Sequence, residues 1–444
     1  MTNYFFLIIV VFLPFQFALN ISDNVDLVTT RILVPVLFLL WLVKSMAQKK
    51  IWIPNRAEMW LIASFLFLSA LSLFLGRDAS AGFRKLFYFF SIFPVFFVAA
   101  DIFREDKWRR RAVLAAIFSG TIAAAIGLFQ FIFSFVAGID KSVKIWESLA
   151  PQILGNSFGK IVAANSSWLV SVGGATRMRA FGFFPDPHNF AFFVNLCLFA
   201  GLGYFFSQKK MASKIWIGAV LALMVAAVGL SFSRGAYLGL LAGGIFFALI
   251  FLKRSVMLGK ALVAIAAIFV LIFFFNSNVI TQRLVSSFNL KEGSNAERYK
   301  NWVQAAEIIQ DNPLGGVGLG NYARAVDPTA ADRSSIYAHN LFLDIAAETG
   351  ILSAIIFLLL ILISIWRNIK NNSMLNLGIA AGLAAFFVHS IFDTALYSPQ
   401  VLTLFLIIIA YSVIARSEAT KQSRSIPGNT RLLRGVYPPS AGSQ

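Results

Sequence analysis

His339 is the residue of this chain that is best placed for acid–base chemistry. It is one of three histidines among 444 residues, and it stands where a long polar interval turns back into an apolar segment. A neutral imidazole can accept a proton near pH 7. An interfacial histidine held by a hydrogen bond is the alternative. We expect His339 to act as a general base, and we expect the adjacent Asn340 to help bind a ligand.

Three arginines are candidates for binding an anion. Arg179 abuts a Gly/Pro break in the chain, Arg234 lies in a very short connection between two apolar runs, and Arg298 lies in an amphipathic segment. A guanidinium fork matches the geometry of a phosphate group. Arg179 and Arg234 could instead snorkel to the membrane interface, and Arg298 could pair with Glu297 or face solvent. We expect Arg179 and Arg234 to bind an anionic ligand such as a phosphate group, and Arg298 either joins that site or pairs elsewhere.

Four further polar side chains could contact a substrate. His188 and Asn189 directly follow Pro187, where irregular backbone at membrane depth would need a watery cavity or protein cover. His389 and Asp393 lie one helical turn apart near the end of a later apolar run. These last two could orient a ligand or satisfy each other.

The usual signatures of metal and nucleotide sites are absent from the sequence. There is no Walker loop, no HExxH, no Gly-x-Ser-x-Gly, and no Asp-x-Asp pair in the polar intervals that could hold a divalent ion on a diphosphate. We therefore expect neither a metal nor another cofactor, with arginines carrying the charge of a leaving group instead.

Residues 294–311 form the amphipathic segment that carries Arg298. Ser294-x-x-Glu297 has the pattern of a capping box, and Asn312-Pro313 should end the helix. One stripe recurs at helical spacing and is expected to pack on the rest of the protein rather than to form a sugar platform: Tyr299, Trp302, Val303, Ala306 and Ile309.

The composition indicates an all-α polytopic membrane protein. The chain is 58% hydrophobic and 13% charged, whereas soluble domains are about a quarter charged. Its apolar runs are long and continuous, which favours spanning helices over barrel strands. The net charge of +18 is explained by basic cytoplasmic loops, so the expected partner is the lipid bilayer and not nucleic acid.

About twelve transmembrane helices are expected from the apolar runs. We interpret the first run as a spanning helix and not as a removed signal peptide, because it lacks a basic start and a clear cleavage site. The runs cover residues 4–19, 27–47, 57–75, 83–103, 112–138, 181–206, 214–230, 235–252, 258–275, 340–366, 374–395 and 398–415.

The distribution of basic residues orients these helices. With the N-terminus in the cytoplasm, the inner loops hold most of the basic residues of the short loops: Lys44, Lys49, Lys50, Arg56, Arg104, Lys107, Arg109, Arg110, Arg111, Lys209, Lys210, Lys214, Lys253, Arg254, Lys260, Arg367 and Lys370. Both long polar intervals, about 139–180 and 276–338, then lie outside the cytoplasmic membrane together with the candidate site.

Residues 1–415 are expected to form a single integral membrane domain. Its motif-bearing part covers about residues 175–395, and its large outer loop covers residues 276–338. Residues 416–444 are polar and basic, and we expect a disordered cytoplasmic tail.

The motifs in this part of the chain resemble those of the O-antigen ligase and O-antigen polymerase family of bacterial envelope glycosyltransferases. The matching pieces are Arg179-Ala-Phe-Gly-Phe-Phe-Pro-Asp-Pro-His-Asn189, Ser233-Arg-Gly235, Arg298-x-x-x-Trp302, Asn312-Pro-x-Gly-x-x-Gly318, His339-Asn-x-x-Leu343 and Glu348-x-Gly350. His188 departs from the family pattern, since relatives often have Asp-Pro-Asn in this stretch.

The resemblance implies a GT-C-like membrane enzyme that works without metal. It would transfer a glycan from an undecaprenyl diphosphate carrier to a glycan or lipid acceptor outside the cytoplasmic membrane, inverting the anomeric centre. Arg179 and Arg234 would hold the diphosphate, and His339 would activate the acceptor hydroxyl.

Two other classes of membrane protein remain open. A polyprenyl enzyme of the peptidoglycan-polymerase type would rely on an acidic residue of the large loop, such as Asp311, Asp327 or Asp332. A flippase for lipid-linked oligosaccharides would place polar groups near the middle of the membrane, whereas the helix middles here are nearly free of ionisable groups.

Overall fold

The computed structural model describes residues 1–22, 25–164, 167–172, 174–252, 293–330, 336–371 and 373–414. The helices of the first half are α1 (Thr2–Phe12), α2 (Thr29–Ala47), α3 (Ala57–Leu71), η1 (Ser72–Leu75), α4 (Ala79–Ile92), α5 (Val95–Ile102), α6 (Asp106–Ala137), α7 (Ile139–Leu154) and α8 (Asn156–Ala164). Those of the second half are α9 (Pro187–Ser207), α10 (Met211–Leu230), α11 (Arg234–Leu252), α14 (Gly293–Asp311), α15 (Tyr322–Val326), α16 (Leu341–Thr349), α17 (Ile351–Lys370), α18 (Met374–Ser390) and α19 (Pro399–Ile414).

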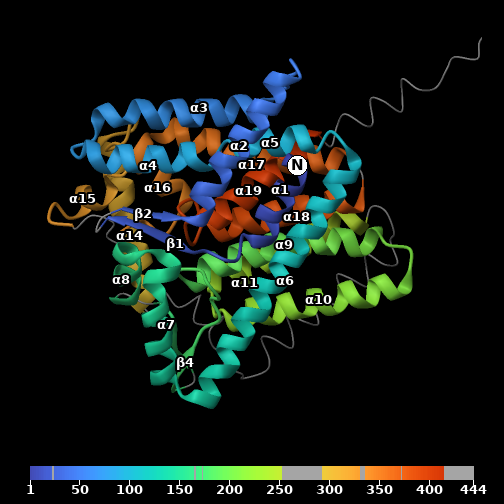
Figure 1. The fold of residues 1–444 in the computed structure, drawn as a ribbon. Coiled ribbons are helices and arrows are strands. Elements are labelled where there is room, and N and C mark those ends of the chain that lie inside the picture. Colours follow the sequence, from blue (N-terminus) through green and yellow to red (C-terminus); the bar gives the residue numbers. More distant parts are fainter. Residues whose placement is uncertain are drawn as a thin grey trace, which may run out of the picture.

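The predicted all-α polytopic architecture is confirmed (Figure 1). Within the described residues, eight helical stretches are long and apolar enough to cross a membrane, and α1, α18 and α19 are shorter apolar helices. Every predicted run contains a helix except the run at 258–275, which lies outside the described residues, as does the tail at 416–444. The described part of the large loop at 276–338 forms α14 and α15.

Several predicted runs differ from the observed helices, and the run at 83–103 is divided into α4 and α5 at Phe93-Pro94. The first run was expected to be helical from residue 4 to 19, but α1 ends at Phe12 because Pro14 cannot continue the hydrogen-bond ladder. The next residues form an antiparallel hairpin of β1 (Ala18–Ser22) and β2 (Val25–Val28). The run at 340–366 is divided into α16 and α17 at Gly350, whose φ of +88° favours glycine.

The centre of the molecule is built around α9. This helix packs on α6, α10 and α18, and α18 also packs on α11. The backbones of α9 and α18 meet at Gly203 and Gly378, where an added Cβ on Gly378 would lie 2.4 Å from the oxygen of Phe199. Small residues allow such close approach between membrane helices.

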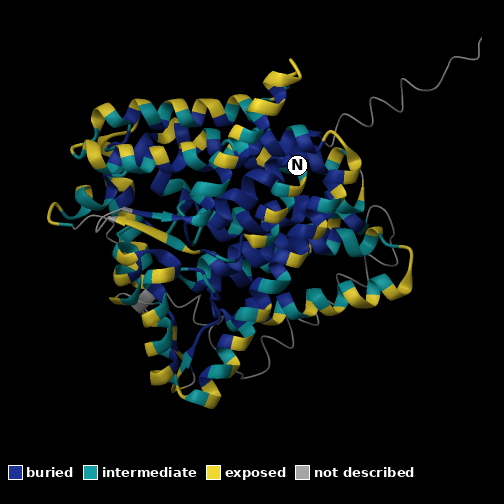
Figure 2. Cartoon of the chain, in the orientation of Figure 1, coloured by how far each residue is buried: buried dark blue, intermediate teal, exposed yellow. Residues whose placement is uncertain are grey.

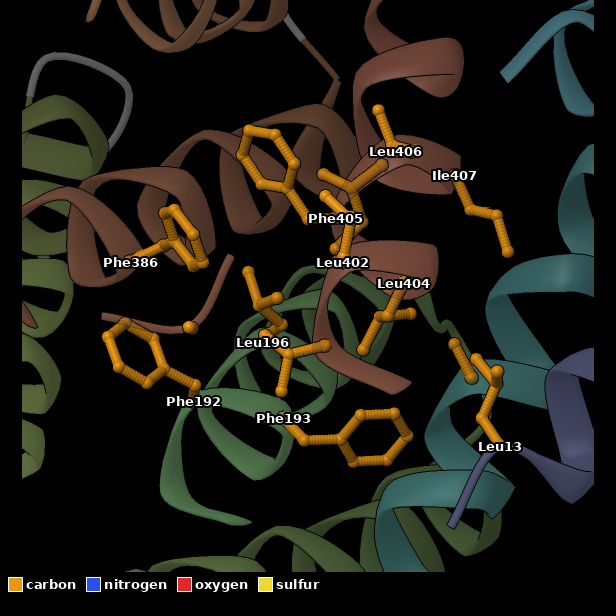
Figure 3. Close-up of a cluster of buried hydrophobic side chains, with 14 of the residues drawn as sticks. Leu13, Phe192, Phe193, Leu196, Phe386, Leu402, Leu404, Phe405, Leu406 and Ile407 are labelled. Carbon is orange, nitrogen blue, oxygen red and sulfur yellow. The ribbon is translucent and has the colours of Figure 1, made fainter. Parts of the chain in front are cut away.

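Aromatic and aliphatic side chains fill this core (Figure 3). The ring of Phe386 on α18 lies between Phe192 of α9, at 5.2 Å, and Phe405 of α19, at 4.7 Å. Figure 2 shows buried residues concentrated in the middle of the molecule and exposed residues along outer helices such as α3 and α10. Several of these exposed residues are large and apolar, among them Phe67 and Trp216, as expected for a surface in contact with lipid.

The glycine-rich turn at 312–321 joins distant parts of the chain. Leu319 N donates to Ser72 Oγ (3.2 Å), and Asp78 N donates to Asn321 Oδ1 (2.7 Å). On its other side the turn touches the break between α16 and α17, because a Cβ on Gly350 would lie 2.0 Å from the oxygen of Leu314. The turn therefore connects the end of α3 to the helix that follows His339.

Candidate functional site

Asp393 is the common partner of the predicted site residues. It follows α18 and is 5% exposed. Its Oδ1 lies 3.4 Å from His339 Nδ1, and its Oδ2 lies 3.0 Å from His188 Nδ1 and 3.5 Å from Arg298 Nη2. Residues from α9, α14, the segment before α16 and the connection after α18 thus meet at one carboxylate.

Asp393 holds His339 in a defined orientation. The contact through Nδ1 leaves Nε2 as the ring nitrogen that can accept a proton from another group. Burial lowers the pKa of His339, but the hydrogen bond and the negative charge of Asp393 outweigh burial, so the pKa lies above its ordinary value. The His339 side chain is 31% exposed, so it is within reach of a ligand. The pair can therefore accept a proton and stabilise the imidazolium that forms.

Asp393 itself remains ionised. Burial raises the pKa of Asp393. The charge and hydrogen bonding of His188 and His339 lower it by a larger amount, so the pKa lies well below the usual range of an aspartate. Its Oδ1 also accepts from Thr394 N at 3.0 Å. A buried carboxylate with this many partners is a fixed negative charge at neutral pH.

His188 connects α9 to the start of α11. Its Nδ1 lies 2.9 Å from Ser233 Oγ as well as 3.0 Å from Asp393 Oδ2. The predicted neighbours Asn189 and Asn340 lie at helix starts. Asn189 donates to the capping residue Asp186 of α9, and Asn340 Oδ1 accepts from the amides of residues 342 and 343 at the start of α16.

Arg179 stabilises the connection between α10 and α11. It is 4% exposed, and it donates from Nε to the oxygen of Ser231 (2.7 Å) and from Nη1 to the oxygen of Ser167 (3.0 Å). In this connection Phe232 has a φ of +48°, which is strained for a residue with a side chain. Arg234 follows as the first residue of α11 and is 5% exposed. The guanidinium of Arg179 therefore supports the backbone that carries Arg234.

His389 does not pair with the Asp393 side chain. Its ring is 1% exposed and stacks on Phe192 with centroids 3.5 Å apart, and neither ring nitrogen has a hydrogen-bond partner among the described residues. The two residues are linked only through the backbone, since Asp393 N donates to the oxygen of His389 (3.2 Å). The expectation that the two side chains could satisfy each other is wrong, because Asp393 turns toward His339 and His188.

The buried face of α14 includes only part of the predicted stripe, with Ile309 packed against the core. Tyr299 and Val303 are 63% and 40% exposed, while Ala305 is fully buried. The face toward the protein is rotated so that Arg298 reaches Asp393 instead of Glu297 or solvent. Trp302 lies on this face, 6.2 Å from the ring of Phe392. The capping role expected of Ser294 concerns a side chain outside the described ones.

Ser233 was recognised in the sequence only as part of the Ser233-Arg-Gly235 motif, and Tyr337 and Asp344 were missed. Ser233 contacts His188, the ring of Tyr337 lies 4.6 Å from that of His339, and Asp344 accepts a hydrogen bond from the backbone beside His339. A signal for Asp344 was present, because an acidic residue within an apolar helical stretch is costly and usually has a function. In the part of the chain that the structure describes, no group of three metal-ligating side chains is found.

Comparison with known proteins agrees with this architecture. Residues 219–358 match a family model described as O-antigen ligase. The match includes Arg234, Arg298 and His339, whereas His188 and Asp393 lie outside it.

Two proteins of Acinetobacter baylyi (strain ATCC 33305 / BD413 / ADP1) are similar to this chain. A ComP-specific O-oligosaccharyltransferase is 23% identical over 429 residues, which cover 92% of this chain and 70% of the relative. A general O-oligosaccharyltransferase is 24% identical over 281 residues, which cover 58% of this chain and 47% of that relative. Together with the many apolar helices, these similarities support an O-antigen ligase-like family.

Proposed function

We propose that this protein is a glycosyltransferase that moves a glycan from an undecaprenyl diphosphate carrier to an acceptor hydroxyl. The observation that carries the proposal is the contact between His339 and Asp393, which leaves one imidazole nitrogen available as a base. The reaction takes place on the outer face of the cytoplasmic membrane, and both termini lie in the cytoplasm. The family match and the two oligosaccharyltransferases support glycan transfer as the type of reaction.

His339 acts as the general base in this proposal. The acceptor hydroxyl gives its proton to Nε2 while its oxygen forms a bond to the anomeric carbon of the donor. The bond from that carbon to the diphosphate oxygen breaks, and the diphosphate leaves with the electron pair. Attack opposite the leaving group inverts the anomeric centre. The negative charge of Asp393 stabilises the imidazolium.

The arginines provide the charge that the leaving diphosphate needs. Arg234 binds the diphosphate, Arg179 holds the connection that carries Arg234, and Arg298 adds positive charge beside Asp393. Guanidinium groups suit a diphosphate because their planar donors match phosphate oxygens and their positive charge stabilises the leaving group.

A donor carried by a membrane lipid accounts for the location of the site at the ends of helices. Residues at the start of α9, the start of α11 and the end of α18 meet where a polyprenyl tail can remain among lipids while its diphosphate reaches the arginines. The acceptor hydroxyl belongs to a glycan, a lipid or a protein. The names of the two relatives describe transfer of an oligosaccharide to oxygen.

Transfer by purified protein tests this function. Wild type and His339→Ala are mixed with an undecaprenyl-diphosphate-linked glycan and a candidate acceptor, with EDTA present. We expect transfer by wild type only, with a loss of about 10²–10⁴-fold in the variant and unchanged donor binding. Thr329→Ala, at an exposed position after α15, is the matched control and should transfer normally.

Three outcomes would contradict the proposal in different ways. Full transfer by His339→Ala would remove the general base, and loss of donor binding in that variant would point to a structural role. Movement of the glycan across a liposome bilayer without transfer would favour a flippase.

A further inference from the structure

The backbone of His339 has a conformation that needs support. Its φ is +52°, in the left-handed region that residues with a side chain seldom adopt. Such a conformation costs about 1–3 kcal/mol and persists only where the surrounding structure imposes it. The contacts that impose it should therefore lie on the residues immediately before and after His339.

Two side chains at the start of α16 make these contacts. After His339, Asn340 Oδ1 accepts from the amides of Phe342 (3.0 Å) and Leu343 (3.2 Å). Before His339, the amide of Ala338 donates to Asp344 Oδ1 at 2.7 Å. Both neighbours of His339 are thereby tied to the first turn of the same helix.

We propose that Asp344 is a positioning residue for His339. By binding the amide of Ala338, it fixes the chain in the left-handed turn that directs the imidazole toward Asp393. This inference rests on the proposed function, in which His339 is the base.

Asp344 lies on a largely apolar part of α16, one turn before Glu348. It is 2% exposed, and its helical neighbours Leu341, Ile345 and Ala347 are buried apolar residues. Burial of a carboxylate is costly unless it is hydrogen-bonded. Its Oδ2 has no hydrogen-bond partner among the described residues. The hydrogen bond from the amide of Ala338 to Oδ1 is therefore the contact that offsets the cost of burying this carboxylate.

The nearby lysine is engaged by another carboxylate. Lys85 Nζ lies 2.6 Å from both carboxylate oxygens of Glu348, one turn further along α16. Burial, with a further contribution from the charge of Glu348, raises the pKa of Asp344 to about 7, while the amide of Ala338, Lys85 and His339 lower it. Neutral and charged forms of Asp344 therefore coexist near pH 7, and either can accept from the amide. An asparagine should reproduce this contact.

Hydrogen exchange and kinetics of two variants test the inference. Asp344→Asn keeps an oxygen for the amide of Ala338, whereas Asp344→Ala removes it. In a peptide covering residues 336–343, the Ala338 amide should exchange slowly in wild type and in the Asn variant, and quickly in the Ala variant. Exchange in α14 should be the same in all three, and size-exclusion and thermal unfolding identify any variant that fails to fold.

Kinetics should separate positioning from binding. We expect Asp344→Ala to lower kcat for glycan transfer about 10²-fold with an unchanged KM for the donor, and Asp344→Asn to retain most of the wild-type kcat. Protection of the Ala338 amide in Asp344→Ala, or wild-type kcat in that variant, would overturn the inference. An Asn variant as inactive as the Ala variant would also overturn it. If wild type transfers no glycan at all, the proposed function fails, while the exchange result still decides the role of Asp344.

Discussion

Two histidines share a single aspartate at this site, and they use different oxygens of it. His339 faces Oδ1 and His188 faces Oδ2 of Asp393. His188 is further fixed by Ser233, so it also restrains the direction of the carboxylate. His188 thus supports the His339–Asp393 contact from the opposite side, even though it departs from the pattern of the resembled family.

Asp393→Asn should both slow transfer and move its pH dependence. In the proposed mechanism His339 acts in its neutral form, so activity should fall as the pH drops below its pKa. Asp393 raises that pKa, and therefore its replacement should shift the acid limb of kcat to lower pH. At neutral pH the rate should fall by about 10²–10⁴-fold because the imidazolium loses its stabilising charge. Asp327→Asn, which changes a carboxylate outside the site, is the control. An acid limb that stays in place in Asp393→Asn would contradict the assignment of Asp393 as the partner of His339.

The glycine-rich turn at 312–321 positions the elements around the site by close packing of backbones. One side of the turn is fixed to the end of α3 and the start of α4 through Ser72 and Asp78. The other side touches α16, since a Cβ on Gly316 would lie 2.4 Å from the backbone carbon of Glu348. Glycines occur here because two backbones approach within the space of a side chain.

Gly350→Ala should destabilise the protein. The added Cβ would lie 2.0 Å from the oxygen of Leu314, and the φ of +88° is unfavourable for alanine. The conformation alone costs about 1–3 kcal/mol, so thermal unfolding in detergent should occur at a lower temperature. Gly244→Ala, within α11 and with nothing within 4 Å of the added carbon, is the matched control and should unfold at the wild-type temperature or slightly above it. Equal unfolding temperatures for Gly350→Ala and wild type would refute this account of the turn.

Across the whole molecule, the buried ion pair between α3 and α17 differs in its role from the charged contacts of the candidate site. Glu58 at the start of α3 and Arg367 in the last turn of α17 are almost completely buried, with Arg367 Nε 2.9 Å from Glu58 Oε1. This pair lies among the basic residues that we expect to face the cytoplasm, whereas the His339–Asp393 contact lies near the loops that we expect outside. The two ends of the bundle thus hold charge for different purposes, one joining helices and the other forming the candidate site.

Cysteine labelling tests the orientation of the bundle. The chain has a single cysteine, Cys197, which is fully buried and should give little background. A membrane-impermeant maleimide applied to intact cells should label Thr329→Cys, at an exposed position after α15, and should leave Met211→Cys unlabelled. Met211 is 70% exposed, so permeabilised cells should label both variants. Labelling of Met211→Cys but not Thr329→Cys in intact cells would invert the proposed topology.

The sequence determined the class of the protein, the approximate place of its helices and most of the residues of the candidate site. Hydropathy and charge depend on near neighbours in the chain, so α2, α6 and α11 could be located from the sequence alone. His339, Arg298, His188 and Asp393 were recognisable because ionisable residues beside apolar runs are costly.

Only the tertiary structure decided how these residues are paired. His339 and Asp393 are 54 positions apart, and Asp393 contacts His339 although His389, at the end of α18, lies only four residues before it. The same packing rotated α14 so that Tyr299 faces outward and Arg298 faces Asp393. Periodicity defines the faces of a helix. The neighbour that each face contacts depends on how helices distant in the sequence pack together, and the local sequence of one helix does not specify that neighbour.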